Sequence, residues 1–137
     1  MAAMKYILLA EDNPADIFML KKCLNSALSI EHEIVEAKNG EEAIKSLEDS
    51  PDVNLIILDL NMPVLDGHEV LKQFKSGDKT KHIPIIVLTS SDNLSDIKKA
   101  YANHANCYIQ KARNLDGFKS ICSRINEFWI QTAVLPD

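Results

Sequence analysis

The sequence predicts an α/β fold, a doubly wound parallel sheet of the (βα)5 type, on three observations. Short apolar runs alternate with longer segments of helical period, and the alternation occurs five times along the chain. This order is typical of parallel strands joined by crossover helices. Three of the runs are continuously apolar and two are interrupted by polar residues, which separates central strands from edge strands. A length of 137 residues suits one domain, so we expect residues 1–137 to share a single core.

Five segments are expected to be strands because each is short, apolar and rich in branched or aromatic side chains. They are Tyr6–Ala10, Glu33–Ala37, Leu55–Leu60, Ile85–Thr89 and Cys107–Gln110. Their starts lie roughly 20 to 30 residues apart, which suits βαβ units. The first, third and fourth runs are continuously apolar and should be central, whereas the second and fifth should be edges. With right-handed crossovers this favours the flavodoxin-like strand order 2-1-3-4-5.

Helices are expected between the strands because apolar residues recur there at three- and four-residue spacing. The first two stripes, which should pack on the sheet, are Ile17, Leu20, Leu24, Leu28 and then Ala43, Ile44, Leu47. Three more stripes are Val70, Leu71, Phe74; Leu94, Ile97, Tyr101; and Leu115, Phe118, Cys122, Ile125, Trp129. Asn13 and Asn114 are suited to cap the first and last helices, and Pro14 suits a first helical position.

Composition excludes several classes of protein. The net charge is −5, with 15 basic against 20 acidic residues, which argues against nucleic-acid binding because that needs a concentrated basic face. No apolar run approaches the roughly 18 residues of a membrane span. The first residues lack a signal-peptide pattern, so we expect a cytoplasmic protein. Cys23, Cys107 and Cys122 contain no Cys-x-x-Cys motif and are expected to be reduced thiols.

Polar residues follow the central strands and the last strand, where ligands of such sheets bind. They are Glu11, Asp12, Asp59, Thr89 and Lys111. One acid after a strand is ordinarily a loop residue or a helix cap. Three carboxylates at ~4 Å repel by several kcal/mol per pair at an effective dielectric of about 20, so a cation is expected among them. Ligands that are all oxygen favour Mg²⁺.

Such a site suits phosphoryl transfer. The metal would lie on one side of the phosphoryl group, with the ammonium of Lys111 and the hydroxyl of Thr89 on the other. Asp59 would supply a carboxylate oxygen as the nucleophile.

Four motifs in order resemble those of response regulator receiver domains, the family that contains the chemotaxis receivers. They are Leu8–Asn13, Leu58–Gly67, Val87–Ser91 and Tyr108–Lys111, and the resemblance covers essentially the whole chain. It implies a response regulator of a two-component or phosphorelay system, phosphorylated by a histidine kinase. Such a protein is a phospho-acceptor with some autodephosphorylation, not a turnover enzyme.

The resemblance also implies roles for the residues around the acids. Asp59 would be the phosphorylation site and Asp12 a direct metal ligand. Glu11 would hold a metal-bound water, and the backbone carbonyl of Asn61 would be a further ligand.

The phosphoryl oxygens would be bound by Thr89, the amide of Ser90 and Lys111. Asn61 and Ser91, each two residues past a site residue, would line the route of hydrolytic water and tune the phosphate lifetime.

Two residues are implied as a switch. Thr89 would move toward the phosphoryl group, and Tyr108 would turn inward on activation. The other reading of Tyr108 is an edge-strand aromatic that covers the sheet. Helix four, strand five and helix five would form the output face.

Three local features complete the expectations. Ala112 follows Lys111 where receivers usually have proline, and we expect a trans bond because a cis non-proline bond costs about 3 to 4 kcal/mol. Pro63–Gly67 should form a turn in which glycine supplies an unusual dihedral. The end of the chain, residues 126–136, is unusually apolar, and it either wraps the core or binds a partner.

This ending and the segment Asn106–Ala112 resemble single-domain regulators that partner bacterial phytochrome kinases and dimerise. Helix five and the tail, about residues 114–137, would join helix four and strand five in a homodimer. With no output domain expected, the protein would act by contacting another protein or by passing the phosphate onward, and the sequence does not choose between these.

Three alternative functions fit the sequence less well. A phosphohydrolase with an aspartyl nucleophile would need a second Asp two residues on, where this chain has Asn61. A flavodoxin-like FMN carrier would need a phosphate-cradling first loop, and the acids of Glu11–Pro14 would repel phosphate. A degenerate receiver acting as an adaptor would lack an acid or the lysine, and none is missing.

Overall fold

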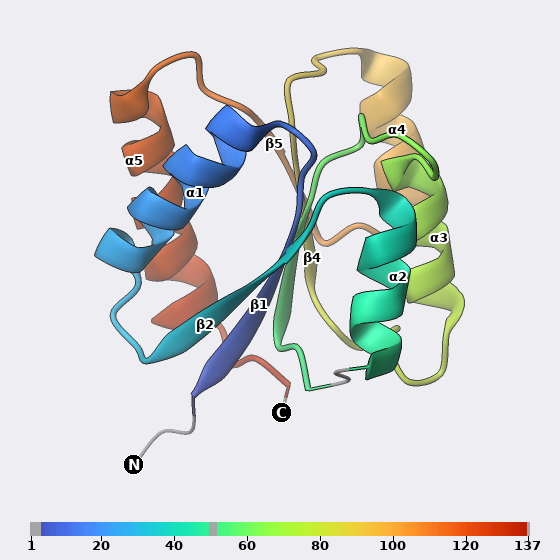
Figure 1. The fold of residues 1–137 in the computed structure, drawn as a ribbon, viewed down its shortest axis with the longest axis horizontal. Helices are drawn as coiled ribbons and strands as arrows, with labels where there is room; N and C mark the ends of the chain where they lie inside the picture. The colour runs from blue at the N-terminus through green and yellow to red at the C-terminus, as the bar shows by residue number, and fades with distance from the viewer. Residues whose placement is uncertain (1–3, 50–51, 137) are drawn as a thin grey trace.

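The computed structural model describes residues 4–49 and 52–136; the remaining residues of the predicted 1–137 domain lie outside this description. The described chain contains one five-stranded parallel sheet with the order β2-β1-β3-β4-β5, which confirms the predicted topology. Figure 1 shows α1 and α5 on one face of the sheet and α2, α3 and α4 on the other. The right-handed crossovers of parallel sheets place helices on both faces in this way.

The strands are β1 (Lys5–Ala10), β2 (His32–Ala37), β3 (Leu55–Leu58), β4 (Ile85–Thr89) and β5 (Cys107–Gln110). The helices are α1 (Pro14–Ala27), α2 (Gly40–Asp49), α3 (Gly67–Ser76), α4 (Leu94–Ala102), α5 (Leu115–Ile125) and the π-helical segment η1 (Asn126–Ile130). The side chains of Asn13 and Asn114 accept hydrogen bonds from backbone N–H groups of the first turns of α1 and α5, as predicted. Among the described residues, no helix is both long enough and apolar enough to cross a bilayer.

The third strand ends two residues earlier than predicted. The N–H of Asn61 donates to Oδ1 of Asp59 at 3.1 Å, and the carbonyl of Leu60 accepts from the N–H of Gly67 at 2.9 Å. These bonds turn the backbone out of the sheet, so the strand stops at Leu58 and places Asp59 just past its end.

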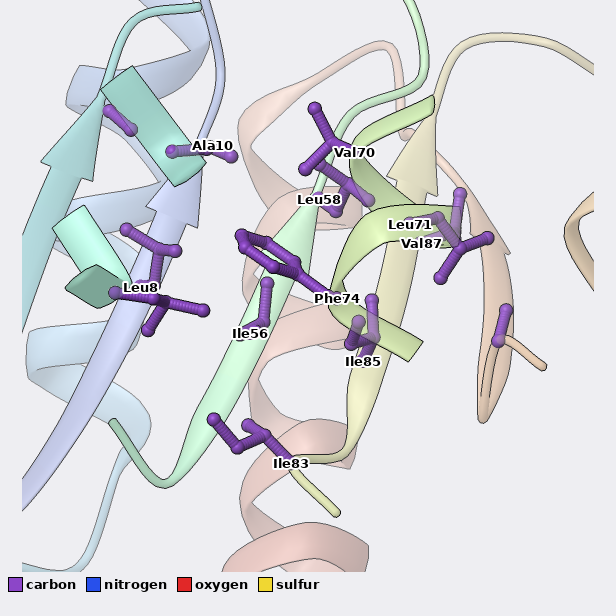
Figure 2. Close-up of a cluster of buried hydrophobic side chains, with 14 of the residues drawn as sticks. Leu8, Ala10, Ile56, Leu58, Val70, Leu71, Phe74, Ile83, Ile85 and Val87 are labelled. Carbon is purple, nitrogen blue, oxygen red and sulfur yellow. The ribbon is translucent and has the colours of Figure 1, made fainter. Parts of the chain in front are cut away.

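The core lies on both faces of the central strands. Successive residues of β1 alternate between the two apolar clusters, with Leu8 in the one under α2 and α3 and Ile7 and Leu9 in the one under α1 and α5. Figure 2 shows Leu8, Ile56 and Phe74 in the first cluster. Every residue of β3 and β4 is buried, whereas β2 and β5 are partly exposed, as expected of edges.

The apolar stripe predicted for the fourth helix is not buried. Leu94 is 63% exposed and Tyr101 is 49% exposed, and α4 instead buries Ala100. The hydroxyl of Tyr101 accepts a hydrogen bond from the N–H of Tyr108 at 3.1 Å. Tyr101 therefore lies along the open edge of β5, where it satisfies a backbone donor that has no neighbouring strand.

The apolar ending packs on the core in part, and its binding of a partner stays a prediction. Leu135 is 8% exposed and packs in the cluster under α1 and α5, and Oδ1 of the buried Asn126 accepts from the N–H of Ser29 at 3.0 Å. By contrast, Phe128 is 55% exposed and Val134 is 95% exposed. One side of this segment wraps the core while the other faces outward.

Candidate functional site

The three acids predicted to converge lie together past the carboxyl ends of β1 and β3. These strands are neighbours in the sheet, with Ala10 beside Leu58. Carboxylate oxygens of Glu11, Asp12 and Asp59 lie within 4.8 Å of one another. Glu11 and Asp59 are buried and Asp12 is exposed, so the cluster opens to the outside on the Asp12 side.

Backbone hydrogen bonds hold the two buried acids in place. The N–H of Asp59 donates to the carbonyl of Ala10, which ties the end of β3 to the end of β1 at 2.9 Å. Oε1 of Glu11 accepts from the N–H of Asn13 at 3.1 Å, and Asn13 in turn caps α1. The acids therefore sit on the rigid sheet and beside a helix start.

Gly67 supports the acid site by a different means from the one predicted. No described glycine has a positive φ, and within Pro63–Gly67 the left-handed conformation belongs to Val64, with φ of 71°. A Cβ atom on Gly67 would instead collide with the carbonyl oxygen of Asp59 and with Leu60. Glycine is needed here because the first turn of α3 packs directly on the backbone of Asp59.

Lys111 joins the acids from the end of β5. Its Nζ lies 2.7 Å from Oε2 of Glu11, 3.1 Å from Oδ2 of Asp59 and 2.8 Å from Oδ2 of Asp16. The backbone N–H of Lys111 donates to the carbonyl of Thr89 at 2.7 Å. The bond between Lys111 and Ala112 is trans, as expected.

Asp16 is the site residue that sequence reasoning missed. It lies in the first turn of α1, where an acid is common because it interacts favourably with the helix dipole. Nothing in the local sequence distinguishes it from the other first-turn acids. Asp16 is identified only by its contact in the folded chain with Lys111, which is 95 residues away in the sequence.

The ion pairs and burial shift two pKa values. Burial raises the pKa of Glu11 to about 7; the negative charge of Asp59 adds to the rise, and hydrogen bonds from Lys111 and Asn13 oppose it. Burial alone would lower the pKa of Lys111, but hydrogen bonds to Asp16 and Glu11 and the charge of Asp59 raise it above its usual value. Lys111 is therefore a permanent cation in this site.

Thr89 and Asn61 lie side by side next to Asp59. Thr89 is fully buried at the end of β4, and its Oγ1 is 3.4 Å from Nδ2 of the exposed Asn61. Ser90, which follows, is exposed. These positions place a hydroxyl and an amide on the β4 side of the acid cluster.

Ser91 and Tyr108 are linked to each other and to α4. The hydroxyl of Ser91 donates to Oδ2 of Asp96 at 2.7 Å, and Oδ1 of Asp96 lies 3.1 Å from Nε2 of His68. The hydroxyl of Tyr108 donates to the carbonyl of Ser91 at 2.9 Å, and its ring packs against the core. The side chain of Ser91 therefore points to α4 and is not gathered with the acids.

The donor set fits a hard divalent cation. It consists of the carboxylate oxygens of Glu11, Asp12 and Asp59 and contains no sulfur or imidazole. One of its acids is open to solvent, which leaves room for the water ligands that Mg²⁺ or Mn²⁺ keeps.

Comparisons with known proteins agree on one family. The model of the response regulator receiver domain matches residues 7–123. The response regulator Rcp1 of Synechocystis sp. is 41% identical, and the alignment covers 96% of this chain and 93% of Rcp1. Among bacterial relatives, the chemotaxis protein CheY1 of Helicobacter pylori is 32% identical over 76% of this chain and 83% of its own.

Solved structures give the same result. The phosphorylated cyanobacterial phytochrome response regulator RcpA is 42% identical, with a TM-score of 0.93, and the match covers 98% of this chain and 100% of RcpA. The Mn²⁺-bound form of Rcp1 is 40% identical with a TM-score of 0.90, covering 97% of this chain and 99% of Rcp1. The chain belongs to the response regulator receiver domains of two-component signalling, with relatives among the phytochrome-associated members.

Proposed function

We propose that Asp59 accepts the phosphoryl group in this receiver. The observation that supports it most is the environment of the Asp59 carboxylate. One oxygen accepts from the N–H of Asn61 at 3.1 Å, and the other lies 3.1 Å from Nζ of Lys111. These two contacts orient the carboxylate just beyond the end of a buried strand, which suits a nucleophile.

In the reaction, a carboxylate oxygen of Asp59 attacks phosphorus. A new P–O bond forms while the bond to the leaving group breaks, which is P–N in a phosphohistidine donor and P–O in acetyl phosphate. Lys111 offsets the negative charge on the phosphoryl oxygens, and the hydroxyl of Thr89 and the amide of Ser90 donate to them. Glu11, Asp12, Asp59 and the carbonyl of Asn61 would hold Mg²⁺, which would supply positive charge to offset the repulsion between the phosphoryl group and the acids.

The lifetime of the acyl phosphate is the second part of the proposal. Asn61 is proposed to govern how a water reaches phosphorus in autodephosphorylation, and the support is its exposed position beside Asp59. Ser91 is expected to act indirectly, because its hydroxyl is engaged by Asp96.

Signal output is proposed to pass through the loop between β4 and α4. If Thr89 moves to a phosphoryl oxygen, the backbone of Ser90 and Ser91 follows it, and the hydroxyl of Tyr108 is bonded to the carbonyl of Ser91. A rearrangement of Thr89 and Tyr108 would thereby reach α4, β5 and α5. Moving such a two-state equilibrium from mostly inactive to mostly active needs about 5 kcal/mol.

The proposed donor is a histidine kinase of the phytochrome type in the cytoplasm. The support is the relation to the cyanobacterial phytochrome response regulator RcpA. The exposed apolar residues of α4 and the outward side of η1 are proposed to serve a homodimer or a downstream protein. Such a partner would receive the signal by contact or by phosphotransfer.

Incubation with acetyl phosphate and Mg²⁺, followed by intact mass measurement, tests the phospho-acceptor proposal. The wild-type chain should gain the mass of one phosphoryl group and lose this gain when EDTA is present. Asp59→Asn should gain none, whereas the matched control Asp78→Asn, an exposed acid far from the site, should behave as wild type. A gain of mass by Asp59→Asn equal to that of wild type would overturn the proposal.

A further inference from the structure

The ammonium of Lys111 has three carboxylate partners, and they differ in kind. Glu11 and Asp59 belong to the acid cluster that lies within 4.8 Å, while Asp16 does not. The side chains of Lys111 and Asp16 are 9% and 20% exposed, so this ion pair is largely shielded from water. Shielded, charge-assisted hydrogen bonds are stronger than exposed ones.

Helix capping alone does not account for the position of the Asp16 carboxylate. The backbone N–H of Asp16 is already satisfied by Oδ1 of Asn13 at 3.2 Å. Asp116 occupies the first turn of α5 and is exposed. Both acids interact favourably with a helix dipole. Of the ion pairs found among the described residues, only that of Asp16 joins a first-turn acid to Lys111.

The three N–H donors of Lys111 must be shared differently during the reaction. Phosphorylation would use an oxygen of Asp59 to form the new P–O bond, and Glu11 and Asp59 would also hold a bound metal ion. Either step would weaken the ion pairs that Glu11 and Asp59 form with Nζ of Lys111. Asp16 takes part in neither step, so its bond to Lys111 at 2.8 Å can persist throughout.

We infer that Asp16 is a positioning residue, which anchors the ammonium of Lys111 beside Asp59 while the other two carboxylates are engaged elsewhere. This inference rests on the proposed phospho-acceptor function. The anchor comes from α1, an element otherwise outside the reaction, and it fixes a lysine whose long side chain would lose rotamer freedom to reach the phosphoryl group. Without Asp16, that ordering would have to occur during phosphoryl transfer.

The test measures the maximal rate of phosphorylation at saturating acetyl phosphate and Mg²⁺. Asp16→Ala should lower the maximal rate about tenfold, as expected for the loss of one charge-assisted hydrogen bond acting in the transition state. Asp16→Asn, which keeps the size of the side chain, should lower it in the same direction. The control Asp116→Ala removes a first-turn acid from α5 and should leave the rate unchanged.

A second arm asks whether Asp16 acts through the lysine. In a Lys111→Met background, which phosphorylates slowly, adding Asp16→Ala should change the residual rate less than twofold. A full tenfold effect in that background, or wild-type rates for both Asp16 variants, would overturn the inference. If the wild-type chain itself gained no phosphoryl mass, the phospho-acceptor proposal would fail instead, so the two failures are distinguishable.

Discussion

Glu11 shows, at the scale of one residue, a conflict between stability and function. Its side chain is 1% exposed, and burial raises the pKa of its carboxyl to about 7. The nearby charge of Asp59 opposes its ionisation, and Lys111 relieves the conflict only in part. The metal-free protein therefore carries a buried acid that is costly to ionise. The proposed metal site gives a functional reason for an acid at this position.

The first prediction concerns stability and pH. The folded state keeps the Glu11 proton up to about pH 7, while the unfolded state releases it near 4.5. The folded state binds more protons in that window, so the contribution of Glu11 to the free energy of unfolding falls as pH rises through it. Without metal, Glu11→Gln should be more stable than wild type by about 1 to 3 kcal/mol at a pH of about 8.

Urea unfolding in EDTA at pH values of about 5 and about 8 checks this result. The difference between variant and wild type should shrink at the lower pH, where Glu11 is protonated and resembles glutamine. A variant less stable than wild type at the higher pH would show that the ion pair with Lys111 outweighs the cost of burial.

The second prediction concerns metal affinity. If Glu11 helps to hold Mg²⁺ as proposed, protons compete with the metal for its carboxylate, so the affinity of the wild-type chain for Mg²⁺ should fall as pH drops below about 7. Calorimetric titration with Mg²⁺ across pH 6 to 8 measures this directly. Glu11→Gln should bind Mg²⁺ more weakly, with little pH dependence in the same range. Equal slopes for the two proteins would assign the competing proton to another group.

At the scale of the elements, the first turn of α3 positions Asp59. Gly67→Ala would press a methyl group onto the Asp59 carbonyl and Leu60, and we expect a loss of about 1 to 3 kcal/mol of stability. Thermal or urea unfolding checks it against Lys72→Ala, a change at an exposed position of α3 that should cost much less. Equal stability of the two variants would mean that α3 can shift away from the strand end without cost.

The exposed face of α4 is expected to take part in self-association. Its exposed Leu94 and Tyr101 form an apolar face next to β5, and we expect this face to serve self-association of the phosphorylated chain. Leu94→Lys should weaken a dimer at least tenfold, since buried charge at an apolar interface is costly. Analytical ultracentrifugation with and without acetyl phosphate measures it.

Phe18→Lys supplies the matched control for α4. Phe18 is 68% exposed on α1, on the opposite face of the sheet, and its replacement should leave association unchanged. If Phe18→Lys abolished the dimer and Leu94→Lys did not, the interface would lie on α1 instead of α4.

Across the whole molecule, the sequence predicts the features that depend on burial and hydrophobic periodicity, which are the strand order and the place where the acids meet. The central strands are continuously apolar because both of their faces are covered. This contrast with the mixed edge strands, together with right-handed crossovers, favours the order 2-1-3-4-5 that the structure has. The strand ends then predict the meeting of Glu11, Asp12 and Asp59, since adjacent parallel strands end at one edge of the sheet.

The remaining features depend on contacts between distant segments. Tyr101 has the spacing of a core residue, but its hydroxyl satisfies the open edge of β5. The sequence predicts that Gly67 supplies an unusual dihedral angle to a turn, but it begins α3, and its close approach to the backbone of Asp59 is what requires glycine. Asp16 resembles an ordinary first-turn acid until the fold brings Lys111 within 2.8 Å. None of these contacts leaves a local pattern in the sequence.

The proposed function requires that, among the clustered acids, the carboxylate of Asp59 attacks phosphorus. The most direct test is to trap the acyl phosphate with borohydride after incubation with acetyl phosphate and Mg²⁺, then to sequence the peptides by mass spectrometry. Borohydride reduces an aspartyl phosphate to homoserine, so position 59 should be converted while positions 11, 12 and 16 stay intact. Conversion at Asp12 with Asp59 unchanged, or a phosphoryl group found on a histidine, would show that Asp59 is not the phospho-acceptor.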